Sequence, residues 1–318
     1  MTLSRRAFLR QTAGIAVLPL VSEIVCAQTY PSRRIGVIVG YAPGGATDIL
    51  ARLIGGWLSK RLGQPVIVEN HPGAGSAVAA EMVMRSPADG YTLFLAAAAN
   101  TINSAIFVHD SAAVAMVSEE PIILSVNPTL PPKTLSEFIA YAKENPSKLS
   151  MASPGTGTVP HIAGEYFKMM ANVDMVHVPY RGGAQALSDL MAGHVKAAFM
   201  GPAASIALIR SGKIRALAVT SNARAAVLPE VPTISEVVPG YEASQWFGVV
   251  APKNTPSEII DKLNTLINEG LADAQVKAIL ADLGQTVVAR SSTEFGKRIA
   301  ADADKWAKVM RTANIKLE

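Results

Sequence analysis

The stretch I-G-V-I-V-G-Y-A-P-G-G-A-T-D-I-L-A-R-L-I-G-G-W-L-S-K-R-L-G-Q-P-V-I-V, residues 35–68, decides the fold class of this chain. Its first five residues form a β-branched run that is typical of a buried strand. Residues 47–62 have the apolar spacing of an amphipathic helix, and residues 66–68 form a second strand-like run. Strand, helix and strand in this order predict a βαβ unit, and therefore a parallel sheet in an α/β protein.

The same alternation continues along the chain and predicts further elements. Strands are expected over residues 91–97, 121–126, 149–152, 175–178, 197–200, 214–220 and 246–250. Helices are expected after residue 75, near residues 161–170 and 184–191, from residue 256, and from the capping-box sequences at residues 134–137 and 291–294. Proline-rich connectors at residues 128–132 and 229–241 are typical of places where a chain crosses between two domains.

The N-terminal segment has the features of an export signal. Arg5 and Arg6 lie in S-R-R-A-F-L-R, an apolar run covers residues 13–21, and V-C-A ends the segment at Ala27. This pattern predicts a twin-arginine signal peptide over residues 1–27 that is cleaved after Ala27, and hence a periplasmic protein. The apolar run is shorter than the roughly 20 residues that a membrane-spanning helix needs.

Composition excludes several kinds of chemistry. The one cysteine, Cys26, lies in the expected signal peptide, so the mature protein would have no disulfide, thiol nucleophile or cysteine metal site. The 29 basic and 25 acidic residues are interspersed, so nucleic acid is not an expected partner. No phosphate-binding loop, dinucleotide fingerprint or nucleophile elbow is present, and the five histidines lack metal-ligand spacing. We therefore expect that the protein is not an enzyme and that it binds no cofactor and no metal.

Several turns between an expected strand and an expected helix are rich in glycine and small hydroxyl residues. They cover residues 41–48, 70–76 and 153–158, and a fourth turn at residues 178–183 adds Tyr180 and Arg181. Glycine lets a ligand approach the backbone, and unpaired N–H groups at a helix start favour carboxylate or phosphate. Alternatively, the glycines only satisfy the geometry of the turns. Four such turns at the carboxyl ends of parallel strands favour a ligand site.

Two polar residues beside these turns have alternative interpretations. Asp48 follows the first turn and is either an acid or base or, as we favour, a first-turn carboxylate that complements the helix dipole. His161 lies at a helix start, where a packing or capping role is favoured over that of a base.

Motifs along almost the whole chain resemble one known family, the Bug-type substrate-binding proteins of tripartite tricarboxylate transporters. The resemblance rests on seven motifs, which are Y-A-P-G-G-A-T-D-I-L-A-R from residue 41, N-H-P-G-A-G-S from 70, D-G-Y-T-L from 89, S-P-G-T-G-T-V-P-H-I-A-G-E from 153, V-H-V-P-Y-R-G from 176, I-R-A-L-A-V-T-S from 214 and W-F-G-V-V-A-P from 246. It implies a type II-like periplasmic binding protein with two α/β domains, each a mainly parallel sheet flanked by helices. Domain one would cover residues 30–125 and 247–318, and domain two residues 126–246.

The resemblance also implies a ligand and partners. A small organic acid, which is a mono-, di- or tricarboxylate, would lie in the cleft between the domains and be delivered to the membrane permease subunits of a tripartite transporter. The alternative is a ligand sensor that docks on a sensor kinase. The expected ligand-binding residues are Tyr41, Gly44, Gly45, Thr47, Asp48, Gly73, Ala74, Gly75, Asn100, Ser153, Thr156, Gly157, Thr158, His161, Tyr180, Arg181 and Gly182.

The chain departs from the family pattern at two places. After Phe107 the usual long connector is replaced by a short passage through residues 108–117, which is expected to reshape one wall of the cleft. After Phe199, Met200 and Gly201 stand where the family commonly has a polar residue, so a contact to a ligand amine or hydroxyl is expected to be missing. An amino acid is therefore the ligand that the resemblance supports least.

Overall fold

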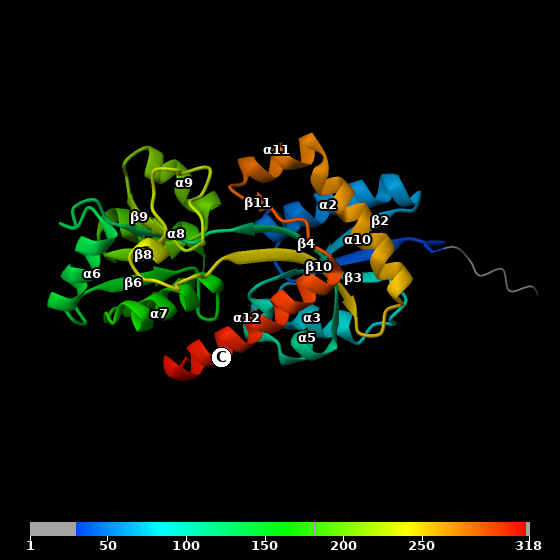
Figure 1. Ribbon diagram of the computed structural model, residues 1–318, viewed down its shortest axis with the longest axis horizontal. Helices are drawn as coiled ribbons and strands as arrows, with labels where there is room; N and C mark the ends of the chain where they lie inside the picture. The colour runs from blue at the N-terminus through cyan, green and yellow to red at the C-terminus, as the bar shows by residue number, and fades with distance from the viewer. Residues whose placement is uncertain (1–29, 181, 316–318) are drawn as a thin grey trace, which may run out of the picture.

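Two β-sheets, each covered by helices on both faces, organise the computed structural model, which describes residues 30–180 and 182–315 (Figure 1). The first sheet has the strand order β11-β4-β10-β3-β1-β2, and the second has the order β7-β6-β8-β5-β9. The two lobes lie side by side, and the long strands β4 and β10 extend toward the boundary between them (Figure 1). The expected signal peptide and Arg181 lie outside the described residues.

The first lobe is built from the two ends of the described chain. Its strands are β1 (Ile35–Val39), β2 (Val66–Asn70), β3 (Thr92–Ala97), β4 (Ser111–Glu120), β10 (Gln245–Pro252) and β11 (Thr286–Val287). One face packs on α2 (Ala46–Leu62), α10 (Ser257–Ala272) and α11 (Ala274–Asp282). The other packs on α3 (Ala77–Met84), α4 (Asn100–Asn103), α5 (Ala105–Asp110) and α12 (Ser292–Thr312). Alternate residues of β1 point to opposite faces and are nearly all buried, which explains why this strand is apolar throughout.

The second lobe is built from the middle of the chain. Its strands are β5 (Ile123–Val126), β6 (Ser150–Ser153), β7 (Val176–Pro179), β8 (Ala197–Met200) and β9 (Arg215–Val219). The helices α6 (Leu135–Glu144) and α7 (Val159–Ala171) cover one face, where Phe138, Phe167 and Phe199 pack together. The helices α8 (Gly183–Ala192) and α9 (Pro202–Arg210) cover the other face.

The two sheets flanked by helices are as predicted, but the sheets are mixed rather than mainly parallel, because neighbours are parallel only in the pairs β1–β2, β1–β3, β6–β7 and β6–β8. In the first sheet β10 runs antiparallel to β3 and β4, and β11 runs antiparallel to β4; in the second sheet β5 runs against its neighbours β8 and β9. Most of residues 108–117 belong to regular structure, because Ser111–Glu120 forms β4, a ten-residue strand that was not expected and that pairs with β10. The capping box at Ser291 and Glu294 is confirmed.

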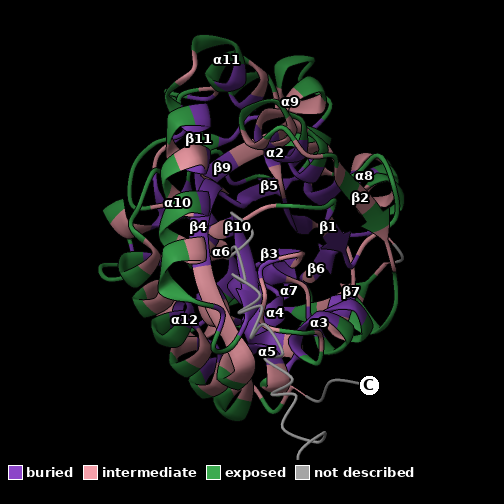
Figure 2. Cartoon of the chain, turned by 90° about the vertical axis from the view of Figure 1, so that its right-hand side faces the viewer, coloured by how far each residue is buried: buried purple, intermediate pink, exposed green. Residues whose placement is uncertain are grey.

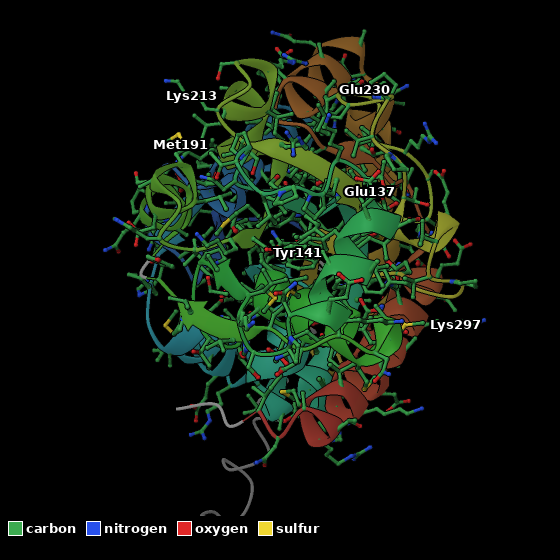
Figure 3. All side chains as sticks on the ribbon, turned by 90° about the vertical axis from the view of Figure 1, so that its left-hand side faces the viewer. Glu137, Tyr141, Met191, Lys213, Glu230 and Lys297 are labelled. Atoms are coloured by element: carbon green, nitrogen blue, oxygen red, sulfur yellow. The ribbon has the colours of Figure 1, made fainter. Side chains whose placement is uncertain are left out.

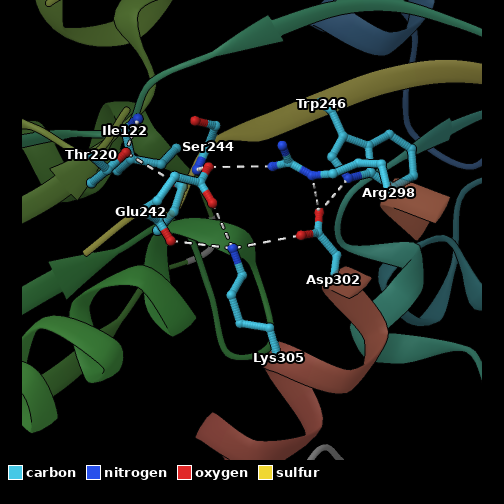
Figure 4. Close-up of polar contacts among 9 residues, drawn as sticks. Ile122, Thr220, Glu242, Ser244, Trp246, Arg298, Asp302 and Lys305 are labelled. Carbon is cyan, nitrogen blue, oxygen red and sulfur yellow. Dashed lines mark hydrogen bonds and ion pairs between the residues drawn. The ribbon is translucent and has the colours of Figure 1, made fainter. Parts of the chain in front are cut away.

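Two connections, one short and one long, carry the chain between the lobes. The first, at residues 121–122, joins β4 to β5, so β5 lies entirely in the second sheet and the boundary expected after Ser125 falls inside a strand. The second runs from Thr220 to Ser244 and returns the chain to β10. The Thr220 hydroxyl joins them, because it accepts a hydrogen bond from the Ile122 N–H (2.7 Å) and donates one to the Ala243 carbonyl (2.9 Å) (Figure 4).

Buried and exposed residues are clearly separated in the structure. The strands of both sheets are buried between helices whose outer faces are exposed (Figure 2). On the outer side of the second lobe Glu137, Lys213 and Glu230 lie well apart, in keeping with the interspersed charges of the sequence (Figure 3). Among the helices of residues 30–180 and 182–315, none combines the length and the apolar character needed to cross a membrane.

Candidate functional site

A cavity of about 280 Å³ lies between the lobes, and residues of both lobes line it. The first lobe contributes the turn before α2 and the end of β3. The second lobe contributes the starts of α7 and α9, and the strand ends at the crossing form the rest of the wall. The lining residues are Tyr41, Gly45, Ala46, Thr47, Ala97, Ala99, Glu120, Ile122, Pro154, Thr158, Val159, Pro160, Gly201, Gln245 and Phe247.

The turn before α2 presents the start of a long helix to the cavity. Gly45 is the N-cap residue and makes no side-chain capping bond, and Ala46 and Thr47 form the first turn of α2. The N–H groups at a helix start carry partial positive charge and lack partners within the helix. This end of the cavity therefore suits a carboxylate or another small anion.

Asp48 holds this turn in shape. Its carboxylate accepts hydrogen bonds from the Gly44 N–H (2.9 Å), the Arg52 guanidinium (3.1 Å) and the Asn70 amide (3.0 Å). The bond from Arg52 is the main reason why the pKa of Asp48 is lowered to about 2. Asp48 does not line the cavity, and the three bonds give it the role of a first-turn carboxylate that fixes the glycine turn.

The turn before α7 is held by its own hydroxyl and imidazole groups. Thr158 is the N-cap of α7; its Oγ1 accepts from the His161 N–H (3.4 Å) and donates to the Gly155 carbonyl (2.7 Å). The Nδ1 atom of His161 accepts a hydrogen bond from the Gly157 N–H (3.1 Å), and this bond stabilises the conformation of the turn. Thr158 lines the cavity, whereas Thr156 is exposed and His161 is buried outside the lining.

His161 stacks on His177 beneath this turn. The ring centroids are 3.8 Å apart with an interplanar angle of 15°, and the Nε2 atom of His177 lies 2.7 Å from Ser153 Oγ. Burial lowers the pKa of His161 to about 3 and that of His177 to about 4. Both rings are therefore neutral near pH 7, and they act in packing and hydrogen bonding, which is the role favoured for His161 from the sequence.

The buried carboxyl group of Glu120 forms part of the cavity lining. Glu120 ends β4 and lines the cavity, and its Oε1 and Oε2 atoms accept from the amides of Gln245 (3.0 Å) and Gln285 (3.5 Å). The Gln285 amide oxygen accepts in turn from the Ser118 hydroxyl (2.5 Å). Burial raises the pKa of Glu120 to about 8, because no cation pairs with it among the described residues and its charged form would lose hydration.

The comparisons with known proteins agree with this geometry. The model of the family described as "Tripartite tricarboxylate transporter family receptor" matches residues 50–315. Protein BugT of Bordetella pertussis is 36% identical over 317 residues, which cover 96% of this chain and 95% of BugT. The chain belongs to this receptor family.

Two of the solved structures to which this chain is similar contain a carboxylate. R. palustris Rpa4515, solved with adipate, is 34% identical with a TM-score of 0.78, and the match covers 90% of this chain and 99% of that one. MatC from Rhodopseudomonas palustris, solved with bound malate, is 32% identical with a TM-score of 0.74, and the match covers 88% and 99%. The family is one of solute-binding receptors, so the predictions of a two-domain binding protein and of a receptor rather than an enzyme are confirmed.

Of the ligand-binding residues predicted from the sequence, the structure brings four into the lining of the cavity. These are Tyr41, Gly45, Thr47 and Thr158. Gly44 and Gly157 belong to the two turns, and Asp48, Ser153 and His161 form hydrogen bonds to residues of these turns.

The other predicted residues lie outside the lining. Gly73, Ala74 and Gly75 lead into α3, where Ala74 and Gly75 have positive φ, and the Asn100 amide oxygen accepts from the Ala97 N–H (2.9 Å). The Tyr180 hydroxyl donates to Asp189 (2.6 Å), and Gly182 is the N-cap of α8.

The lining also contains residues that sequence reasoning missed. Glu120, Ile122, Gln245 and Phe247 come from the two chain crossings, where the strands β4 and β10 end or begin. Of the two crossings predicted from the sequence, the one at residues 128–132 is wrong, because these residues join β5 to α6 within the second lobe. The one at residues 229–241 lies in the returning connection that leads to Gln245. Within residues 30–180 and 182–315, no group of three or more histidine, cysteine or acidic side chains is placed to hold a metal ion.

Proposed function

We propose that this protein is an extracytoplasmic solute receptor that binds a small organic carboxylate in the cavity between its lobes and delivers it to the permease of a tripartite transporter. The observation that carries the proposal is a single cavity lined by two helix starts from different lobes, Gly45–Thr47 of α2 and Thr158–Pro160 of α7. A ligand that contacts both lobes stabilises the closed arrangement.

The chemistry of the lining supports a carboxylate. The N–H groups of the first turn of α2 and the hydroxyl of Thr47 are donors, and apolar residues such as Ala97, Val159 and Phe247 surround them. Donors in an apolar cavity fix the orientation of a small anion and let the rest of its surface be desolvated. Adipate in R. palustris Rpa4515 and malate in MatC are ligands of this class in related receptors.

Export to the periplasm belongs to the same proposal. The twin-arginine pattern at Arg5 and Arg6 and the family of periplasmic receptors both support it. Replacing both arginines by lysine is expected to leave the protein in the cytoplasm, and cell fractionation measures this directly.

The test of ligand binding is a thermal-shift screen of the exported protein against mono-, di- and tricarboxylates, followed by calorimetry of the best ligand. A ligand at 100 times its Kd stabilises the folded protein by about 2.7 kcal/mol, which raises the Tm by about 5 °C for a protein of this size. A screen in which no carboxylate raises the Tm contradicts the proposal.

A further inference from the structure

The cavity lining contains an acidic residue, Glu120, whereas a receptor for anions would be expected to have a cationic residue there. Glu120 is 5% exposed, and no lysine, arginine or histidine is among the described residues that line the cavity. Its two oxygens accept from the amides of Gln245 and Gln285, and no ion pair joins it to another described residue. An ionised Glu120 would repel any carboxylate that entered the same cavity.

Glu120 lies close to residues of both lobes. It ends β4 in the first lobe, and Gln245 begins the returning strand β10. A Cβ atom on Gly201, at the start of α9 in the second lobe, would lie 3.1 Å from Glu120 Oε1. Met200 and Gly201 stand where the family pattern commonly has a polar residue, and the Glu120 carboxyl group comes close to Gly201.

We propose that Glu120, in its protonated form, donates a hydrogen bond to a second carboxylate of the ligand and so selects dicarboxylates. This inference rests on the proposed function, in which the first carboxylate lies at the start of α2. The acid and the second carboxylate share one proton, so the pair carries one negative charge instead of two. Hydrogen bonds between an acid and a carboxylate are among the strongest in proteins.

Burial favours the protonated form of Glu120 at neutral pH. It raises the pKa to about 8, although the hydrogen bond that the Gln285 amide donates to Oε2 acts in the opposite direction and lowers it. In the cavity Tyr41 is the other titratable group among the described lining residues, and burial raises its pKa to about 12, so it stays neutral.

On the other side of the crossing strands Glu120 borders a second hollow with several charged residues. They are Glu119, Arg224, Glu242, Arg290 and Arg298. Arg224 pairs with Glu236, and Arg298 pairs with Glu242 and Asp302. Lys305 and Arg298 hold the pKa of Glu242 at about 2 despite its burial, so this carboxylate stays ionised. The ion pairs therefore keep their charge while Glu120 titrates.

The experiment compares a dicarboxylate with a monocarboxylate of the same chain length by titration calorimetry. Succinate, glutarate and adipate are paired with butyrate, valerate and hexanoate, at about pH 7 and about pH 9.5. Both pH values lie above the range of roughly pH 4 to 6 in which free carboxyls, including the second carboxyl of a dicarboxylate, titrate. The affinity of the best dicarboxylate is expected to fall at least about tenfold between the two pH values, because Glu120 loses its proton. The monocarboxylate should change much less.

The variant Glu120→Gln carries a permanently neutral donor of nearly the same shape. It should bind the dicarboxylate about equally at both pH values, while Glu119→Gln, one residue earlier on β4, should keep the pH dependence of the wild type. Calorimetry in buffers of different ionisation enthalpy should also show wild-type protein taking up close to one proton per dicarboxylate near pH 9 and almost none near pH 7. This measurement needs no variant, so it stands even if Glu120→Gln fails to fold.

Other outcomes overturn the inference without touching the proposed function. Dicarboxylate binding that is independent of pH, tight binding of monocarboxylates alone, or an amino-dicarboxylate such as glutamate that binds more tightly at the higher pH would each contradict it. Failure of every carboxylate at both pH values would instead contradict the proposed function.

Discussion

The indole Nε1 atom of Trp246 donates a 2.7 Å hydrogen bond to Oδ2 of Asp302, and both side chains are buried (Figure 4). Trp246 lies on β10, just after the chain returns from the second lobe, and Asp302 lies on α12. Arg298 pairs with the same carboxylate at 3.0 Å, and Lys305 and Arg298 also contact Glu242 in the returning connection. This cluster anchors one of the two crossings to the last helix.

The cluster gives the first prediction. In Asp302→Ala, the Trp246 N–H loses its acceptor and Arg298 loses a partner, and leaving such groups buried and unpaired should lower the free energy of unfolding by about 3 kcal/mol. Urea denaturation measures the change. Asp304→Ala, an exposed acidic residue on the same helix, should stay within about 0.5 kcal/mol of the wild type. Equal stability of the two variants would show that the cluster contributes little.

The second prediction concerns the close approach of the two glycine turns. A Cβ atom on Gly40 would lie 2.9 Å from the Cα atom of Ser76 and closer still to its side chain, so Gly40→Ala must push residues 74–76 away from the end of β1. We expect a loss of about 2 kcal/mol in stability and weaker ligand binding, because the turn that begins at Tyr41 follows directly.

Gly56→Ala is the matched control for this variant. Gly56 lies on the exposed side of α2, and an added methyl group there would meet no other atom within 4 Å, so alanine should stabilise the helix by up to about 1 kcal/mol. Thermal unfolding and calorimetry of both variants make the comparison. A Gly40→Ala protein as stable as the wild type would contradict the packing described.

The third prediction concerns the first turn of α2. Thr47 lines the cavity, and its hydroxyl makes no hydrogen bond to another described residue. Thr47→Val removes the hydroxyl at nearly constant shape, and the loss of one hydrogen bond to a charged ligand should weaken binding about tenfold. Thr265→Val, on the exposed face of α10 in the same lobe, should leave the affinity unchanged. Unchanged binding in Thr47→Val would show that this hydroxyl does not bind the ligand.

The fourth prediction concerns acid stability. Since the folded-state pKa values of His161 and His177 are about 3 and about 4, below the usual 6.5 of histidine, the unfolded chain binds more protons between these values. Stability from this pair is therefore fully present above about pH 6.5 and is lost as the pH falls toward 4. His177→Gln should lower stability at pH 7 but flatten this loss, as measured by denaturation at several pH values.

His109→Gln serves as the control for the histidine pair, because His109 is exposed on α5. It should retain the acid dependence of the wild type. If His177→Gln and His109→Gln lose stability in parallel as the pH falls, the stacked pair is not a source of the acid sensitivity.

The sequence predicted the elements whose signal is local. The β-branched run of β1, the apolar run of β8 and the glycine turns were predicted closely because each is specified by neighbouring residues. The strand β4 was missed, because its small and apolar residues form a strand only through pairing with β10, more than a hundred residues away. Glu120 was missed for the same reason, since it becomes buried only when Gln245 and Gln285 come together around it.

If both lobes contact one carboxylate ligand in the cavity, a crystal structure with the ligand that binds best will show it. We expect one carboxylate within about 3 Å of the N–H groups at the start of α2, with the same ligand in contact with the α7 start at Thr158–Pro160. A ligand that touches a single lobe, or lies outside this cavity, would contradict it.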